Sequence, residues 1–540
     1  MADVTVIGGV SHAKGKEFQY EAMSLPQMLD RSAERHRNKT AITFYQMEIS
    51  YGQLQGLTRQ VAAALRRIGV GKGDKVGLML PNCPQYVGAF YGVLRRGAVV
   101  VQVNPMYTER EIEYVLQDSG ADVLFVLADL YPRVKNVEGY ENLKKVIVVQ
   151  LAPISPELAE NAVFWGDFLD RAPAVADEPV DPEQDVAVLQ YTGGTTGRSK
   201  GAMLTHRNLV ANVQQINAHT SEEPLTEGDK ILTVIPLFHV YGMTCAMNLG
   251  ILTGTNVILL PRFDPLEVLQ TIKQHRPTYF PGVPTMYVAL NSYPGSEHYG
   301  IDAIRICNSG SAPLPVELIE SFEKKTGASM FEGYGLSEAS PTTHSTPRTG
   351  LKKPGSIGIP LPATEARIVD LESGTRTLPI GEAGELVIRG PQVMQGYWNM
   401  PQETVHAIRD GWLYTGDIAR MDEDGYFSII DRKKDLIIAS GYNVYPREIE
   451  EVLYTHPCVL EAVVVGVPDE YRGETIKAFV VLKPGASAST EEIERFCRKN
   501  LAAFKVPRQI EFRESLPKTA VGKILRRVLA EEAKRQGAGM

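Results

Sequence analysis

The chain has 540 residues, of which 44% are hydrophobic and 22% charged, a composition typical of globular proteins. Its 56 basic and 64 acidic side chains give a net charge of −8, which is small for this length and argues against nucleic acid as a main partner. Domains of roughly 100 to 200 residues are the norm, so the length also excludes a single small binding module.

The cysteines and the amino-terminal residues indicate in which cellular compartment to expect the protein. Five cysteines lie far apart and form no CxxC pair, which argues against a metal or redox centre built from them. The first residues lack the apolar core of a signal peptide, and no run of about 18 uninterrupted apolar residues follows. We therefore expect a soluble, cytoplasmic protein with reduced thiols.

The first part of the chain alternates short β-branched runs with helical periodicity, as in KVGLML followed by YVGAFYGVLRRG. This alternation is typical of βαβ units in a parallel, doubly wound sheet. Near Ala363 it gives way to short runs broken by Gly and Asp, TEARIVDLESG, ELVIRG and GYFSIIDRKKDLII, which predict a small β-rich subdomain.

After the charged link DRKKD the α/β pattern returns. PREIEEVLYTHP and EEIERFCRKNLAAF predict helices, and VLEAVVVGVP between them predicts a strand. We predict an α/β protein with a large N-terminal body over residues 1–431, made of two doubly wound α/β subdomains and a small β-barrel-like subdomain. A hinge at 432–434 and a small mobile α+β C-terminal domain at 435–540 would follow.

The densest chemical signal is YTGGTTGRSKG, from Tyr191 to Gly201, which follows the apolar strand DVAVLQ. Glycines let backbone amides approach an anion, hydroxyls add donors, and Lys200 supplies a positive charge for phosphates. The spacing is not that of a Walker A loop, because Ser199 precedes Lys200 and a glycine follows it. From composition alone, a surface hairpin remains an alternative.

Weaker signals follow along the chain. In EGYGLSEASP the ring of Tyr334 offers a stacking face, and the carboxylate of Glu338 suits a hard cation such as Mg²⁺, although it suits a helix cap equally. Asp417 in YTGD and Arg432 in DRKKD could bind a sugar diol or belong to plain hairpins. Lys523, in LPKTAVGKILRRVL, could equally be a solvated lysine in a basic end of the chain.

Taken in order, YTGGTTGRSKG, EGYGLSE, YTGD, DRKKDLIIASGYNVYP and PKTAVGK resemble the adenylate-forming superfamily, which includes acyl-CoA synthetases, luciferases and peptide-synthetase adenylation domains. The resemblance covers essentially the whole chain. The residues of the motifs are most similar to those of bacterial long-chain fatty acid CoA ligases. It implies that a fatty acid carboxylate attacks the α-phosphate of ATP to give an acyl-adenylate, from which coenzyme A then displaces AMP.

The resemblance also implies roles for individual residues, which fall into an ATP group, a metal group, and an acyl and coenzyme A group. Lys523, Glu338 and Thr192 would be catalytic, with Thr192 and Glu338 holding Mg²⁺ and Lys434 as the pivot. The ATP group would be Thr192, Gly193, Gly194, Thr195, Thr196, Gly197, Lys200, Gly310, Ser311, Ala312, Glu332, Gly333, Tyr334, Gly335, Ser337, Asp417, Arg432 and Lys523.

The apolar run VYGMTCAMNLGILTG, from Val240 to Gly254, is a candidate wall for the acyl chain, and a core helix would look similar. The acyl and coenzyme A group would be His239, Tyr241, Gly242, Met243, Ser440, Gly441 and Asn443.

Three other functions stay open from the sequence. They are a ligase of the same fold for aryl or cinnamic acids, a stand-alone adenylation enzyme that loads a carrier protein, and a catalytically silent lipid-binding protein. A homodimer and a transient contact with the inner face of the membrane are further expectations that the sequence leaves open.

Overall fold

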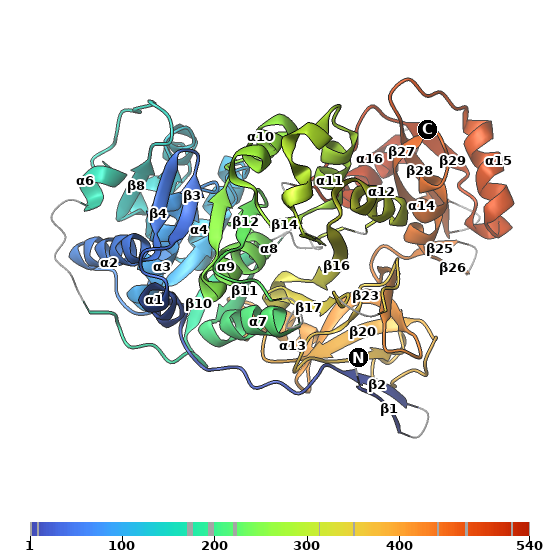
Figure 1. The fold of residues 1–540 in the computed structure, drawn as a ribbon. Coiled ribbons are helices and arrows are strands. Elements are labelled where there is room, and N and C mark those ends of the chain that lie inside the picture. The colour runs from blue at the N-terminus through green and yellow to red at the C-terminus, as the bar shows by residue number, and fades with distance from the viewer. Residues whose placement is uncertain are drawn as a thin grey trace. The chain divides into compact units, whose positions relative to one another are not determined.

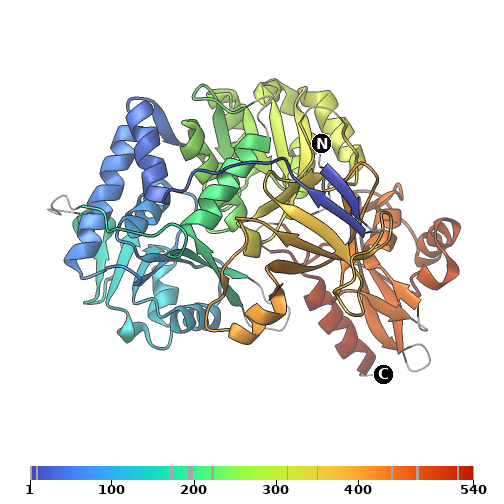
Figure 2. The ribbon, with the colours of Figure 1, turned by 90° about the horizontal axis from the view of Figure 1, so that it is seen from below.

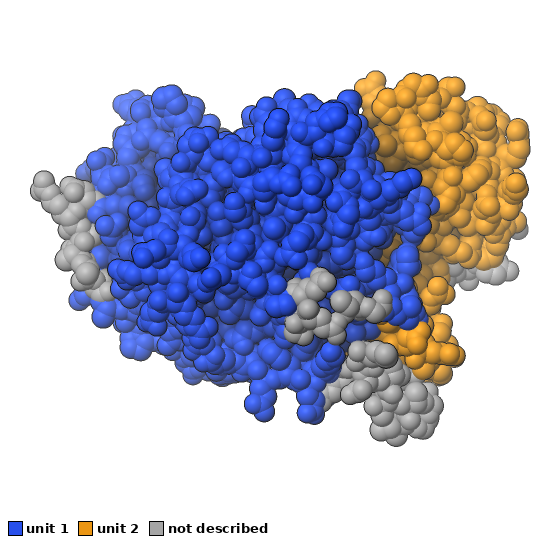
Figure 3. Space-filling model, viewed as in Figure 1, with its two compact units in different colours: residues 1–3, 13–365, 388–413 blue, residues 4–12, 366–387, 414–540 orange. Residues whose placement is uncertain are grey.

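The computed structural model describes residues 3–7, 10–169, 176–192, 199–219, 224–312, 314–348, 351–439, 442–469, 473–519 and 522–538. The chain forms two compact units (Figure 3). The first comprises residues 1–3, 13–365 and 388–413, and the second comprises residues 4–12, 366–387 and 414–540.

The first unit contains two large sheets, and Figure 1 labels several of their strands. One has the order β21-β11-β10-β6-β5-β7-β8-β9, in which the strands from β10 to β9 run parallel. Its strands are β5 (Lys75–Met79), β6 (Val99–Gln102), β7 (Val123–Leu127), β8 (Lys145–Val149), β9 (Ala162–Phe164), β10 (Val186–Thr192), β11 (Lys200–Thr205) and β21 (Gly396–Tyr397). All four residues of β6 are buried, as expected for a parallel sheet covered on both faces.

The other sheet has the order β18-β17-β16-β15-β14-β12-β13-β3-β4, with parallel pairing from β16 to β3. Its strands are β3 (Thr40–Phe44), β4 (Met47–Ser50), β12 (Lys230–Thr233), β13 (Asn256–Leu259), β14 (Tyr279–Gly282), β15 (Ile306–Ser309), β16 (Ser329–Gly335), β17 (Thr342–Ser345) and β18 (Ile359–Pro360). These two mainly parallel sheets confirm the predicted α/β class.

Helices connect the parallel strands, and capping side chains fix where several begin. Ser50 and Gln53 form a capping box at the start of α2, and Thr108 and Glu111 form one at α4. The helices of this unit are α1 (Leu25–Arg35), α2 (Tyr51–Arg67), α3 (Pro84–Arg95), α4 (Glu109–Ser119), α5 (Tyr131–Lys135), η1 (Tyr140–Asn142), α6 (Trp165–Leu169), α7 (His206–His219), α8 (Val240–Gly242), η2 (Met243–Asn248), α9 (Leu249–Thr253), α10 (Pro265–His275), α11 (Pro284–Ser292), η3 (Ser296–Tyr299), η4 (Ile301–Ala303), α12 (Val316–Thr326), η5 (Ser337–Ala339) and α13 (Pro401–Ala407), followed by the short strand β22 (Ile408–Arg409).

The second unit contains the predicted β-rich part. Its sheet has the order β1-β2-β19-β20-β23, with β24 paired to β23. Figure 2 shows the blue N-terminal hairpin beside the yellow and orange strands of this sheet. The strands are β1 (Asp3–Ile7), β2 (Val10–Lys14), β19 (Glu365–Val369), β20 (Gly384–Arg389), β23 (Trp412–Met421) and β24 (Phe427–Arg432). The three short runs predicted after Ala363 are therefore strands, and β1 and β2 join them from the far end of the sequence.

The last part of the second unit is a sheet of order β26-β25-β28-β27, with β29 beside β28. Its elements are β25 (Ile437–Ala439), β26 (Tyr442–Val444), α14 (Pro446–Tyr454), β27 (Val459–Asp469), β28 (Gly473–Leu482), α15 (Thr490–Asn500), η6 (Ala503–Lys505), β29 (Gln509–Phe512) and α16 (Arg526–Ala538). The two predicted helices and the strand between them are confirmed as α14, α15 and β27.

Both faces of this C-terminal sheet are buried, which follows from the alternation of side chains along β27. Val464 lies in a core with Ile449 of α14 and Ile493 of α15. Its neighbour Val465 lies in a second core with Leu529 of α16. A strand of period two thus supplies apolar side chains to helices on both sides.

Among the described residues, no helix is long and apolar enough to cross a membrane.

Candidate active site

The predicted phosphate loop joins two strands of the first unit. β10 and β11 pair antiparallel, which places Thr192 opposite Lys200. The intervening candidates, Gly193, Gly194, Thr195, Thr196 and Gly197, lie outside the described residues. The structure therefore places the two residues at the ends of the loop opposite each other on paired strands.

Lys200 and Glu338 share a partner that the sequence did not single out. The Lys200 ammonium group lies 5.1 Å from the centre of the Tyr397 ring and forms an ion pair with Glu403 of α13. The Tyr397 hydroxyl donates a hydrogen bond of 2.7 Å to Glu338 Oε1. The candidate phosphate lysine and the candidate metal ligand therefore contact the same tyrosine.

Electrostatics keep the groups of this cluster in defined states. Burial and the negative charge of Glu338 raise the pKa of Tyr397 well above its usual value, so its hydroxyl stays protonated and can donate. The hydrogen bond and charge of Lys200 lower the pKa of Glu403, so that carboxylate stays ionised. Glu338 is thus oriented by a neutral donor, and Lys200 by an anion.

Glu338 and the hydroxyl of Thr192 are the two side chains of this site that could bind Mg²⁺ together with a phosphate group. No group of three or more His, Cys, Asp or Glu side chains that could hold a metal occurs in the described part of the chain. Mg²⁺ in nucleotide sites is commonly bound by one or two protein oxygen ligands together with phosphate oxygens and water. One oriented carboxylate, Glu338, and the hydroxyl of Thr192 match that pattern.

The predicted adenine-binding residues lie at the ends of two adjacent parallel strands. β15 leads into Gly310, Ser311 and Ala312, and Glu332 to Gly335 end β16, with Ser309 paired to Glu332. The ring of Tyr334 contacts His344 at 6.0 Å between centroids. Ligands of open α/β sheets bind at such carboxyl ends of strands.

Gly335 at this edge has no room for a side chain, and Gly310 has little. A Cβ on Gly335 would lie 2.1 Å from the carbonyl oxygen of Pro341, and one on Gly310 would lie 3.3 Å from the ring of Tyr241. Ser337 follows as the first residue of η5. The backbone therefore turns tightly from β16 to the segment that carries Glu338.

The candidate acyl wall is a helix with a π-helical turn, formed by α8, η2 and α9. His239 caps it, because its Nδ1 accepts a hydrogen bond of 3.2 Å from the backbone N–H of Tyr241. The Tyr241 hydroxyl donates at 2.8 Å to the backbone oxygen of Asn308, beneath the Gly310 turn. Met243 is fully buried, and its sulfur accepts a hydrogen bond from Gln102 at 3.6 Å.

In the second unit, the predicted ribose residues face each other across a strand pair. Asp417 of β23 lies opposite Arg432 of β24, and their side chains form an ion pair of 3.1 Å. The hydroxyl of Thr415 accepts a hydrogen bond of 3.1 Å from the N–H of Asp417. This pairing brings a carboxylate and a guanidinium group to one place on the sheet.

Lys523 lies in the electrostatic field of the same pair. Burial, and after it the charge of Arg432, lower the pKa of Lys523 to about 8, and the charge of Asp417 opposes this shift. Lys434, the predicted pivot, also acts on Lys523, and burial lowers its own pKa. Lys523 belongs to the second unit, whereas Lys200 and Glu338 belong to the first.

The predicted coenzyme A loop is described only in part. Ser440 and Gly441 lie outside the described residues, and so does the side chain of Asn443. The backbone of Asn443 is in β26, which pairs with β25.

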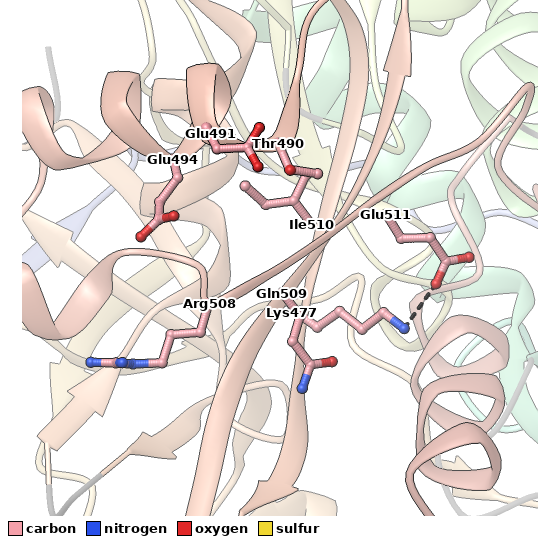
Figure 4. A pocket seen from close by; sticks show the side chains of 8 residues that line it. All are labelled: Lys477, Thr490, Glu491, Glu494, Arg508, Gln509, Ile510 and Glu511. Carbon is pink, nitrogen blue, oxygen red and sulfur yellow. Dashed lines mark ion pairs between the residues drawn. The ribbon is translucent and has the colours of Figure 1, made fainter. Parts of the chain in front are cut away.

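A cavity of about 440 Å³ opens on the C-terminal sheet (Figure 4). Lys477 and Glu511 form an ion pair of 2.8 Å at its wall. The lining residues are Lys477, Thr490, Glu491, Glu494, Arg508, Gln509, Ile510 and Glu511. None of the predicted site residues lines this cavity.

Comparison with known proteins assigns the family. The profile of the AMP-binding enzyme family matches residues 29–398, and that of the AMP-binding enzyme C-terminal domain matches residues 448–523. The chain belongs to the AMP-binding enzyme family. The two matches flank the segment in which the sequence predicts a hinge.

Individual AMP-binding enzymes resemble the chain over nearly its whole length. A long-chain-fatty-acid–CoA ligase of Bacillus subtilis is 49% identical over 531 residues, which cover 94% of each chain. One of Salmonella typhimurium is 39% identical over 95% of each chain. The crystal structure of an anthranilate CoA ligase in complex with anthranoyl-AMP matches with a TM-score of 0.89 and 30% identity, covering 96% of this chain and 98% of the other.

Tyr397 and Glu403 are the residues of this cluster that the sequence did not reveal. They lie about two hundred positions from Lys200, and β21 brings them to it by pairing with β11, with Tyr397 opposite Ala202. The run GYWNMPQET offers one local signal, because Pro401 at the start of α13 places Glu403 in its first turn.

Proposed function

We propose that this protein is an ATP-dependent ligase that activates a medium- or long-chain fatty acid as its acyl-adenylate and transfers the acyl group to coenzyme A. The 49% identity with a long-chain-fatty-acid–CoA ligase over 94% of both chains carries this proposal. ATP and coenzyme A are substrates of this class of ligase, and AMP and pyrophosphate are the other products.

In the first half-reaction, an oxygen of the fatty acid carboxylate attacks the α-phosphorus of ATP, an acyl–phosphate bond forms, and pyrophosphate leaves. Two anions must meet, so the protein has to neutralise charge more than it has to move protons. Lys200 and the loop after Thr192 would bind the outer phosphates. Lys523 would bridge the carboxylate and the α-phosphate.

The nucleoside would be held by the groups at the strand ends. Tyr334 and the Gly310 turn would bracket adenine, Ser337 would reach the α-phosphate, and Asp417 with Arg432 would bind the ribose. Glu338 and Thr192 would hold Mg²⁺, which supplies positive charge to the phosphates when it is bound. The tyrosine donor on Glu338 and the strand register of Thr192 support this assignment.

In the second half-reaction, the thiol sulfur of coenzyme A attacks the acyl carbon, a thioester forms, and AMP leaves. The loop with Ser440, Gly441 and Asn443 would guide the pantetheine arm. Lys434 would be the pivot between a body of residues 1–431 and a lid of residues 435–540, so that Lys523 approaches ATP only in the first half-reaction.

A substrate panel tests the acyl specificity. We expect coenzyme A thioesters from palmitate and octanoate and little turnover of 4-coumarate. Turnover of 4-coumarate alone would make this an aryl acid ligase, the activity that the more distant anthranilate CoA ligase represents. Acyl-adenylate formation with carrier loading and no acyl-CoA would support a carrier-loading enzyme instead.

Contact with a membrane surface and homodimer formation are finer proposals. Long-chain fatty acids partition into membranes, and the β3–β4 hairpin exposes two large apolar side chains, Tyr45 and Met47. Flotation with liposomes that contain fatty acid tests the first proposal. Sedimentation equilibrium tests the second.

A further inference from the structure

Arg526 is the first residue of α16, three positions after Lys523. Its guanidinium group faces three carboxylates. Nη2 donates to both oxygens of Glu450 at 2.8 Å, Nη1 lies 3.8 Å from Asp431 Oδ1, and Nε lies 3.9 Å from Asp435 Oδ2. One cation therefore lies among three carboxylates within the second unit and pairs most closely with Glu450.

Two of these acids flank the predicted hinge at 432–434. Asp431 is 4% exposed, and its carboxylate is fixed by the backbone N–H groups of Arg432 at 2.7 Å and Arg447 at 2.9 Å. Glu450 is 8% exposed and accepts a hydrogen bond of 2.7 Å from the N–H of Val464. Buried carboxylates of this kind are strongly destabilising when their cation is removed.

The same cluster fixes the base of the loop that carries Lys523. The N–H of Thr519 donates to the carbonyl of Lys523 at 2.8 Å, and the N–H of Lys523 donates to the Thr519 hydroxyl at 3.2 Å. The N–H of Leu525 closes the loop on Pro517 at 2.8 Å. Because Arg526 directly follows this closed loop, its ion pairs set where the loop lies relative to residues 431–435.

We propose that Arg526 is a positioning residue for Lys523 in the adenylation half-reaction, and that its ion pair with Asp431 breaks when the C-terminal part turns for thioester formation. The inference rests on the proposed function. Glu450 follows the hinge, as Arg526 does, so their short bidentate pair persists through the turn. Asp431 precedes the hinge, so a rotation about Lys434 separates it both from Arg526 and from the backbone N–H of Arg447.

The chain offers a matched control in Arg527, the next residue of α16. Its side chain is 55% exposed and pairs with Glu531 one turn along the same helix. Arg527→Met removes the same charge and the same length of side chain without touching the acid cluster.

The test measures the two half-reactions separately. Arg526→Met should lower fatty-acid-dependent ATP–pyrophosphate exchange about 10-fold or more, since small misplacements of a catalytic group are costly. Thioester formation from synthetic acyl-adenylate and coenzyme A should stay within about 2-fold of wild type. Arg527→Met should change neither rate. Equal loss in both half-reactions, or unchanged exchange, would overturn the proposal.

A second variant covers the case in which Arg526→Met does not fold. Asp431→Asn keeps the Glu450 pair and removes the negative charge that faces Arg526, while its amide oxygen retains one of the two acceptors for the N–H groups of Arg432 and Arg447. It should slow exchange and speed tryptic cleavage at the basic residues Arg432, Lys433 and Lys434, because the segment is less restrained. Cleavage and exchange equal to those of Arg527→Met would contradict the proposal.

One further variant separates this inference from the proposed function. Lys523→Ala should abolish most pyrophosphate exchange. If Lys523→Ala retains exchange, the assignment of Lys523 fails. If exchange is lost in Lys523→Ala and normal in Arg526→Met and Asp431→Asn, the role of Arg526 alone fails.

Discussion

At the scale of single residues, Tyr397 shows how one side chain serves two charged groups. Its ring lies under the Lys200 ammonium group and its hydroxyl bonds to Glu338. The ring attracts a cation through its π face, whereas the hydroxyl orients a carboxylate. The two contacts can therefore be removed separately.

Tyr397→Phe should weaken the proposed Mg²⁺ site and leave Lys200 in place. The variant keeps the ring and loses the hydrogen bond to Glu338, worth about 1.5 to 3 kcal/mol for a bond to a charged group. We expect the Mg²⁺ concentration at half-maximal nucleotide binding to rise about 10-fold or more, as measured by titration calorimetry with ATP. Tyr45→Phe, on the exposed β3–β4 hairpin, is the control. An unchanged Mg²⁺ dependence in Tyr397→Phe would contradict this role.

Lys523 should give adenylation a high-pH limit. Burial and Arg432 lower its pKa to about 8, so its positive charge is present below pH 8 and is lost as the pH rises through that value. The rate of pyrophosphate exchange at low substrate concentration should therefore fall above about pH 8. The rate of thioester formation from acyl-adenylate should not.

Lys523→Ala is the control for this pH profile. It should reduce exchange about 10²- to 10³-fold, equivalent to roughly 3 to 4 kcal/mol of transition-state stabilisation. The remaining activity should lack the high-pH limit. A limit that survives the substitution would assign the titration to another group.

At the scale of elements, the segment α8–η2–α9 combines a core helix with a candidate substrate wall. Tyr241, Cys245 and Leu249 lie in the hydrophobic core of the second sheet. The Thr244 hydroxyl is buried without a hydrogen-bond partner among the described residues. π-Helical turns occur frequently at functional sites. The sequence left a core helix and an acyl wall as alternatives, and the packing shows that one face is core.

Gly242 lets this segment pack closely against the backbone of Pro236. A Cβ there would lie 2.2 Å from the carbonyl oxygen of Pro236, so Gly242→Ala should lower the free energy of unfolding by about 1 to 3 kcal/mol. Gly56→Ala is the matched control, because nothing lies within 4 Å of a Cβ at that exposed position in α2. It should raise stability by about 0.5 to 1 kcal/mol. Equal melting temperatures for the two variants would refute this account.

At the scale of the whole molecule, buried histidines couple stability to pH. Burial lowers the pKa of His206 and of His219 to about 4, and that of His344 to about 3. Histidines in the unfolded chain bind protons below about pH 6.5. The unfolded state therefore binds more protons between about pH 6.5 and 4, and the free energy of unfolding decreases as the pH falls through this range.

We expect a loss of about 1.4 kcal/mol per pH unit for each such histidine, measured by urea unfolding at pH 7 and pH 5. His206→Asn retains an acceptor for the N–H of Leu25 and removes one titrating group, so its pH dependence should be shallower. His298→Asn, whose side chain is 82% exposed, should follow wild type. Parallel curves for all three proteins would contradict the assignment.

The amino-acid sequence by itself determined what depends on local spacing. The β-branched runs, the helical periodicity and the order of the glycine-rich motifs are properties of neighbouring residues, and they predicted the α/β class, the strands after Ala363 and the family. Only the tertiary structure decided which charged groups share a partner. Tyr397 meets Lys200 and Glu338 because β21 pairs with β11. Arg526 at the start of α16 meets Asp431 of β24 and Glu450 of α14, on elements that are far from it in the sequence. Such contacts depend on strand order and on packing between distant positions of the chain. They therefore produce no periodic pattern in the sequence.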